Sequence, residues 1–288
     1  MNPLTSVITL TYNKLGCTRR CLESLLQTAY QPWELVVVDN GSTDGTAEWL
    51  GEFRERAAGC GVRVLPILNR RNVGCCTARN QGIEGSTGER IVFVDNDVAL
   101  RSRGWLGRLG DCLERDPRIG IAGPKLVYPF APFRIQFAGG EVSPNGRVKF
   151  RGRGEDKDDP VYNAPRDVQC FISACFMTRR TIVRELGGFD EIFNPVEYED
   201  IDFSYRVRSR GYRIVYVPAV EMYHFENVTT NGTPSLPNTY LIVKHGMVFK
   251  RRWHHMFERE NGPADAETRW RSIEKKDFAL IGELEVTD

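Results

Sequence analysis

The sequence predicts an α/β fold, with a mostly parallel central sheet flanked by helices. Two observations carry this prediction. Short apolar runs alternate with amphipathic segments over residues 6–94, in the order β-α-β-α-β-α-β. The apolar runs are nearly continuous in Val, Ile and Leu, as in parallel strands that are covered on both faces. With 288 residues and 41% hydrophobic residues, the chain can bury a sizeable core.

The first half reads as a doubly wound sheet. We expect strands at 6–11, 34–39, 62–67 and 90–94, with helices at roughly 17–28, 47–59 and 75–84. Pro66 predicts an edge position for the third strand, because proline cannot donate to a neighbouring strand. A helix over 105–113 and a short strand at 119–123, ended by Pro124, complete this half.

The second half begins with residues 124–166, which are rich in Pro, Gly and charges and predict an insertion that covers a substrate. An apolar run predicts a strand at 168–178, and short helices follow at 180–186 and from about 199 to Gly211. Strands at 213–217 and 220–225 are separated by Pro218 and Ala219, and one helix covers 238–257. We therefore expect one domain at 1–235, with halves at 1–123 and 124–235, and a C-terminal helical extension at 236–288.

Composition argues against several classes of protein. Lys and Arg number 39 against 38 Asp and Glu, so no overall positive field favours nucleic acid as a partner. The eight cysteines form no CxxC pair and predict reduced thiols in a cytoplasmic protein. Residues 1–6 lack a signal-peptide pattern, and no apolar run is long enough to span a bilayer.

The basic and aromatic run at 250–255 has two interpretations. It is a solvated helix end, or it contacts an anionic membrane surface or a phosphate-bearing acceptor. The second interpretation places the protein peripherally at the inner membrane surface.

Asp95-Asn96-Asp97 directly follows the strand at 90–94 and is the clearest chemical signal in the chain. Two carboxylates at the carboxyl edge of a parallel sheet suit Mg²⁺ or Mn²⁺ bridging to a phosphate, although a turn also favours these residues. Polar loops at 11–13 and 39–44 follow two further strands. Because such strand ends lie side by side, the three loops together predict a ligand site.

Residues 5–230 resemble the family 2 glycosyltransferases of the GT-A fold, and in particular their bacterial rhamnosyltransferase-like branch. The resemblance rests on motifs in a fixed order: Thr11-Tyr12-Asn13, the run Val36-Val37-Val38-Asp39 with Asn40-Gly41-Ser42-Thr43-Asp44-Gly45-Thr46, Asn69-x-x-Asn72-x-Gly74, Ala78-Arg79-Asn80, Asp95-Asn96-Asp97, Glu199-Asp200-x-Asp202 with Arg206, and Tyr216-Val217-Pro218 leading to His224.

The resemblance implies an inverting enzyme that moves a sugar from a UDP or dTDP sugar to a hydroxyl of a glycan, lipid-linked or other acceptor, in cell-surface polysaccharide or glycoconjugate synthesis. Residues 1–123 would bind the nucleotide sugar, and 124–235 would hold the acceptor. Asp39 would accept a hydrogen bond from the base imide, with further nucleotide contacts from Thr11, Tyr12, Asn13, Asn72, Arg79 and Asp95.

The resemblance also implies a metal site and a general base. Asp97 would bind Mg²⁺ or Mn²⁺, with Asp95 and His224 as further ligands, although a lone histidine is often structural. Asp200 would be the base, and the adjacent charge of Glu199 would raise its pKa. Alternatively, Glu199 or Asp202 only caps the following helix. Glu197 is a weaker candidate for the base.

Two departures concern the acceptor side, namely Ser173-Ala174-Cys175 where relatives carry Ser-Gly-Ala, and Thr229 where Ser is common. Two other functions remain open. A nucleotidyltransferase would carry a glycine-rich phosphate loop after the first strand, which residues 11–16 lack. A non-catalytic sugar-nucleotide-binding module would be expected to lose the base or a metal-binding Asp, and this chain keeps both.

Overall fold

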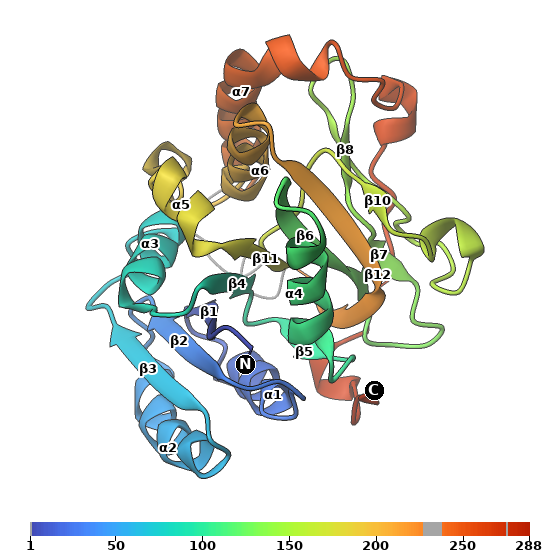
Figure 1. The fold of residues 1–288 in the computed structure, drawn as a ribbon. Helices are drawn as coiled ribbons and strands as arrows, with labels where there is room; N and C mark the ends of the chain where they lie inside the picture. Colours follow the sequence, from blue (N-terminus) through green and yellow to red (C-terminus); the bar gives the residue numbers. More distant parts are fainter. Residues whose placement is uncertain (1, 227–237, 275) are drawn as a thin grey trace.

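A computed structural model describes residues 2–226, 238–274 and 276–288. Within these residues ten strands form one mixed, mostly parallel sheet in the order β10-β12-β6-β11-β4-β1-β2-β3, with β5 pairing β12 and β7 pairing β6. Helices flank this sheet (Figure 1), which confirms the predicted fold class. Thr229, one of the two departures on the acceptor side, lies outside the described residues.

The sheet strands are β1 (Thr5–Thr11), β2 (Trp33–Asp39), β3 (Arg63–Leu68), β4 (Arg90–Val94), β5 (Val98–Leu100), β6 (Ile119–Val127), β7 (Ile135–Phe137), β10 (Arg166–Asp167), β11 (Cys175–Arg179) and β12 (Arg213–His224). Strands β8 (Gly140–Val142) and β9 (Val148–Phe150) form a separate antiparallel pair. The helices are α1 (Leu15–Leu25), α2 (Thr46–Gly59), α3 (Cys75–Gly85), α4 (Trp105–Arg115), α5 (Arg180–Leu186), α6 (Glu199–Ser209) and α7 (Asn238–Phe257).

The first half follows the prediction closely. Strand β1 pairs in parallel with both β2 and β4, and β3 lies at the sheet edge as Pro66 predicts. Helix α3 packs closely on β1 at Gly82. A Cβ added at this position would lie only 2.5 Å from Ile8. Because β1, β2 and β4 run parallel to one another, the loops that follow them leave the same edge of the sheet, as expected.

Two predicted strand boundaries, at Pro124 and at Pro218, are wrong. Strand β6 continues through Pro124, and β12 continues through Pro218. Pro124 pairs with Val217, and the next paired residues are Lys125 and Glu221, so three residues of β12 bulge out between them. Pro218 lies within this bulge, whose backbone makes no ladder hydrogen bonds, and Pro124 lies directly beside it.

The predicted strand at 168–178 is also largely wrong, since only Cys175–Arg179 forms β11. Two side chains of α6 accept hydrogen bonds from the backbone that precedes β11. Phe171 N donates to Ser204 Oγ at 3.0 Å, and Ser173 N donates to Asp200 Oδ2 at 2.9 Å. These donors are thus unavailable to a neighbouring strand, and the segment remains irregular.

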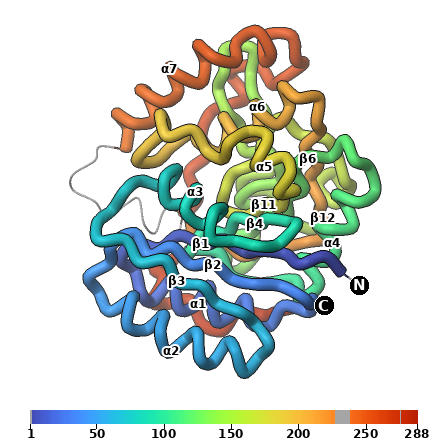
Figure 2. The backbone as a smooth tube through the Cα atoms, turned by 60° about the vertical axis from the view of Figure 1, so that its left-hand side comes forward, coloured from blue at the N-terminus to red at the C-terminus, as the bar shows by residue number. Residues whose placement is uncertain are grey.

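The predicted helix at 238–257 is confirmed as α7, which lies beside α6 in Figures 1 and 2. Trp253 Nε1 donates to the buried carboxylate of Asp202 at 2.8 Å, and Phe249 packs edge-on against Tyr205. The chain then returns to the opposite side of the molecule, where Thr287 bridges Ser102 beside β5.

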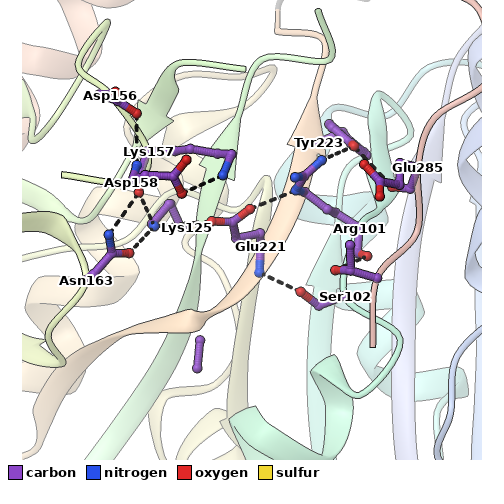
Figure 3. Close-up of polar contacts among 12 residues, drawn as sticks. Arg101, Ser102, Lys125, Asp156, Lys157, Asp158, Asn163, Glu221, Tyr223 and Glu285 are labelled. Carbon is purple, nitrogen blue, oxygen red and sulfur yellow. Dashed lines mark hydrogen bonds and ion pairs between the residues drawn. The ribbon is translucent and has the colours of Figure 1, made fainter. Parts of the chain in front are cut away.

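Ionic contacts fix β12 after its bulge (Figure 3). The Glu221 carboxylate accepts from Lys125 Nζ at 3.2 Å and from Arg101 Nε at 2.7 Å. Arg101 also bonds the hydroxyl of Tyr223, which donates to the backbone of Glu285. The end of β12 is therefore held from both sides. In the part of the chain that the structure describes, no helix is long and apolar enough to cross a membrane.

Candidate active site

A cavity of about 750 Å³ opens at the carboxyl ends of β1, β2 and β4. Its donor wall, as we name the side formed by these strand ends and α3, contains Thr11, Tyr12, Asn40, Asn72, Arg79, Asp95 and Asp97. Its acceptor wall contains Ser173, Glu197, Glu199, Asp200, Ile242 and Trp270, and His224, Gln136 and Glu226 line the same cavity. Two predicted residues, Asn13 and Asp39, are not among the lining residues.

Asp39 and Asn13 hold the loops beside the cavity. Asp39 Oδ1 accepts from Ser42 N at 3.1 Å, and the Ser42 hydroxyl bonds both the Asp39 carboxylate and the backbone N–H of Asn13. Asn13 Oδ1 in turn accepts from Thr43 N. Burial raises the pKa of Asp39, against the hydrogen bonds from Ser42. Both residues adjoin the lining residues Tyr12 and Asn40 in the chain.

Asn72 is bound to Asn40, which belongs to the motif after the second strand but was given no role of its own. Asn40 Nδ2 donates to Asn72 Oδ1 at 2.9 Å, and Asn40 Oδ1 accepts from Val73 N at 3.0 Å. Asn40 directly follows Asp39, and this position was the available signal. The pair ties the loop after β2 to the loop before α3.

The structure brings Asp97 and His224 together. The chain turns after Asp97 into the short strand β5, which pairs antiparallel with the end of β12 and sets His224 opposite Val98. His224 Nε2 lies 3.3 Å from Asp97 Oδ1. Burial lowers the pKa of His224, but the carboxylates of Asp97, Glu226 and Asp95 together outweigh burial and raise this pKa above its ordinary value.

This pair fits a divalent cation. A carboxylate oxygen and an imidazole nitrogen suit Mn²⁺ or Mg²⁺, which take further ligands from phosphate oxygens and water. Over residues 2–226, 238–274 and 276–288, no group of three or more His, Cys, Asp or Glu is arranged to hold an ion by itself. The two side chains would thus hold a metal together with a phosphate-bearing ligand.

Asp95 faces Arg79 instead. Arg79 donates to Asp95 Oδ1 at 3.0 Å, to Glu199 Oε1 at 2.7 Å and to Ser173 Oγ at 2.7 Å. Burial raises the pKa of Asp95, and Arg79 opposes this shift. The Arg79 guanidinium therefore joins Asp95 of the donor wall to Glu199 of the acceptor wall. Its nearest partners are Asp95, Glu199 and Ser173.

The acceptor wall carries three carboxylates on a strained turn. Glu197 and Tyr198 both adopt left-handed φ angles, 86° and 70°, which side chains rarely adopt. Burial, together with the charge of Glu199, raises the pKa of Asp200 to about 7 and that of Glu197 to about 7. Asp200 accepts from Ser173 N and from Ile201 N. A carboxylate with a pKa near neutrality is suited to general base catalysis.

The family model for "Glycosyl transferase family 2" matches residues 6–187. That match covers more than half of the chain. The chain belongs to glycosyl transferase family 2.

Its relatives differ in length. An uncharacterised protein of Sinorhizobium fredii is 30% identical over 287 residues, which is 96% of this chain but only 30% of that protein. An N-acetylglucosaminyl-diphospho-decaprenol L-rhamnosyltransferase of Mycobacterium tuberculosis is 28% identical, and the match covers 94% of this chain and 89% of the relative. The chain therefore spans less than a third of the first relative and most of the second.

Solved structures share the fold. GalNAc-T7, determined with UDP, GalNAc and Mn²⁺, superimposes with a TM-score of 0.71 at 19% identity, covering 89% of this chain and 50% of that chain. The mannosyltransferase PcManGT from Pyrobaculum calidifontis, with GDP-Man and Mn²⁺, gives a TM-score of 0.57 at 19% identity, covering 90% and 71%. These likenesses place this family 2 chain among GT-A-like folds.

The reading of Glu199 or Asp202 as a helix cap is wrong. Tyr198 precedes α6 without a side-chain cap, Glu199 binds Arg79, and Asp202 accepts from Trp253 and Arg252. Asp202 thus fastens α7 to α6.

Gln136 and Glu226 are site residues that sequence reasoning missed. Both are buried beside His224. Glu226 follows His224 by two positions, the spacing that puts side chains of an extended chain on one face, so a signal for it was present. Gln136 lies far away in the sequence within an apolar strand, and no comparable signal points to it.

Proposed function

We propose that this family 2 enzyme is a metal-dependent inverting transferase that moves a hexose or deoxyhexose from a UDP or dTDP sugar to an acceptor hydroxyl. The observation that carries the proposal is the single cavity shared by Asp97 with His224 and by Asp200. The groups proposed to hold the cation and its phosphates, Asp97 and His224, thus line the same cavity as Asp200, a base with a pKa of about 7.

The reaction follows from this arrangement. Asp200 accepts the proton of the acceptor hydroxyl, whose oxygen forms a bond to the anomeric carbon as the bond from that carbon to the diphosphate oxygen breaks. The attack comes from the face opposite the leaving group, so the anomeric configuration inverts. When bound, the cation neutralises charge that develops on the leaving diphosphate.

The two walls divide the remaining work. Asp97 and His224 would hold the cation, and Thr11, Tyr12, Asn40 and Asn72 would enclose the nucleotide. Asp39 would fix the loop after β2 and accept from the base imide once that loop has adjusted to the nucleotide. Arg79 would hold Asp95 and Glu199 in place, and its charge would also attract the diphosphate.

The acceptor would be lipid-linked, in the synthesis of a cell-surface polysaccharide or glycoconjugate. The mycobacterial relative, an N-acetylglucosaminyl-diphospho-decaprenol L-rhamnosyltransferase, supports this assignment, since it matches over most of its length. Helix α7 supports contact with an anionic membrane surface. It exposes Tyr240, Val243 and Met247, and it also exposes the cationic Lys244 and Arg251. A cytoplasmic enzyme at the inner membrane surface would fit these features.

A donor panel tests the proposal. UDP-, dTDP- and GDP-sugars are incubated with Mn²⁺, and released nucleotide is separated by chromatography. We expect turnover of UDP or dTDP sugars with release of the nucleoside diphosphate, and Asp39→Ala should weaken nucleotide binding about tenfold. Release of a nucleoside monophosphate would instead indicate nucleotidyl chemistry, and binding without any release would indicate a non-catalytic module.

A further inference from the structure

A buried hydrogen-bond chain runs from His224 through Gln136 and Glu226, in the wall of the cavity, to Arg153. His224 Nδ1 lies 3.2 Å from Gln136 Oε1, and Gln136 Nε2 donates to Glu226 Oε1 at 3.1 Å. Both terminal nitrogens of Arg153 donate to the Glu226 carboxylate, at 2.5 and 3.1 Å. The hydroxyl of Tyr128 also donates to this carboxylate. Gln136 is fully buried and Glu226 is 5% exposed, so water does not compete for these contacts.

The direction of each hydrogen bond in this chain follows from chemistry. The bidentate ion pair with Arg153 favours an ionised Glu226, and an ionised carboxylate only accepts hydrogen bonds. The end of Gln136 that faces Glu226 must therefore be its NH₂ group. The amide oxygen then faces His224 Nδ1, and an amide oxygen only accepts, so Nδ1 must carry a proton.

We propose that Gln136 and Glu226 are positioning residues that keep the His224 proton on Nδ1 and so leave Nε2 as the nitrogen that binds the cation. Nε2 is the nitrogen that faces Asp97, at 3.3 Å. Metal-binding histidines in general need a partner that fixes the tautomer and the ring orientation, and loss of that partner weakens metal binding about 10- to 100-fold. This inference rests on the proposed function, because it assumes that His224 is a metal ligand.

The anchor of the chain comes from distant segments. Arg153 belongs to the insertion at 124–166. Its guanidinium stacks on Trp270 of the C-terminal extension, 3.8 Å from the ring centre, and its Nε donates to the backbone of Arg271 at 2.8 Å. The insertion and the extension thus jointly hold the carboxylate that orients Gln136.

The test measures Mn²⁺ binding to the full chain in the presence of saturating UDP or dTDP, which supplies the phosphate oxygens, by electron paramagnetic resonance titration. Gln136→Met keeps the volume but removes the acceptor for Nδ1, and it should weaken Mn²⁺ binding about 10- to 100-fold. Gln169→Met is the matched control. Gln169 bonds the backbone of Val142 and the side chain of Glu260, away from His224. That control should bind Mn²⁺ like the wild type.

Electron spin-echo modulation supplies a second signal, because it detects an imidazole nitrogen bound to Mn²⁺. The wild type should show this nitrogen signal, His224→Ala should lose it, and Gln136→Met should lose most of it at saturating Mn²⁺. A Gln136→Met variant that keeps both the wild-type affinity and the full nitrogen signal would overturn the inference. A wild type without the nitrogen signal would instead refute His224 as a ligand, and with it the metal assignment in the proposed function.

Should Gln136→Met fail to fold, Glu226→Gln provides the same test. The amide at 226 can present either an oxygen or an NH₂ group, so Gln136 is no longer held in one orientation. We expect weaker Mn²⁺ binding here too, and wild-type affinity in a folded Glu226→Gln protein would contradict the inference.

Discussion

The donor wall and the acceptor wall of the cavity are built in different ways. The donor wall comes from the ends of three adjacent parallel strands, each followed at once by a polar loop, as with Tyr12 after β1 and Asp97 after β4. The acceptor wall combines segments that lie far apart in the chain, from Ser173 through Asp200 to Trp270. Backbone register positions the first wall, and side-chain hydrogen bonds and ion pairs position the second.

This difference predicts which substitutions will change the site locally and which will also lower the stability of the fold. The backbone pairing that positions the strand ends does not depend on the side chains that follow them. Where the two walls meet, Arg79 and Asp95 of the donor wall and Glu199 of the acceptor wall depend on one another, so removing Arg79 leaves two carboxylates without their cation. The predictions below separate these two cases.

The largest effect is expected at the donor wall with Asp97→Ala. Loss of the carboxylate should lower metal-stimulated turnover about 10³-fold or more, because charge on the leaving diphosphate is no longer neutralised. The melting temperature should change little. Steady-state assays with a Mn²⁺ titration check this, and undiminished activity in the presence of a chelator would show that no cation is needed.

Arg79→Met should act on both walls. It leaves the buried Glu199 and the partly exposed Asp95 without their cation, so we expect a destabilisation of about 3 kcal/mol as well as lower turnover. Urea unfolding measures the first effect and kcat the second. The comparison between the walls would fail if stability stayed within about 0.5 kcal/mol of the wild type.

The pH dependence of kcat reports on Asp200. The pKa of this carboxyl is raised from 3.8 to about 7, so it is protonated and unable to accept a proton below that pH. Activity should therefore fall as the pH drops through about 7. The pKa of Glu197 is also raised to about 7, and the profile must be repeated in Glu197→Gln. If that substitution removes the acidic limb, the limb belongs to Glu197.

The smallest effect is expected for Trp270→Ala, at the far end of the chain that orients His224. Arg153 keeps its pairing with Glu226 without the stacked ring, so Mn²⁺ affinity should fall only about two- to fivefold. A spin-resonance titration measures this change. A loss as large as that of His224→Ala would mean that Trp270 contacts the bound ligand directly.

The sequence predicted the two walls unequally, for physical reasons. The ends of β1, β2 and β4 follow from local patterns, since apolar runs define the strands and parallel pairing places their ends together. The bulge that keeps Pro124 and Pro218 within strands was not predictable, because it exists only where β6 meets β12. It directs the end of β12 toward β5 and so brings His224 to Asp97.

The contacts that join distant segments around the cavity show the limit more strongly. Arg79 appears in the sequence as a residue for phosphates, but its contacts with Asp95 and Glu199 join segments that local patterns cannot relate. Gln136 is recognisable only once His224 is known to lie beside it. The roles of Asp200 and Glu197 likewise depend on burial, which the positions alone do not reveal.

Asp200→Asn and Glu197→Gln, compared in one assay, test the central claim most directly. Calorimetry measures binding of UDP or dTDP with Mn²⁺, and turnover of the accepted donor sugar with an acceptor measures transfer. The account predicts that Asp200→Asn binds nucleotide normally but loses transfer about 10²- to 10⁴-fold, whereas Glu197→Gln loses no more than about tenfold. The reverse order, or full transfer by Asp200→Asn, would contradict it.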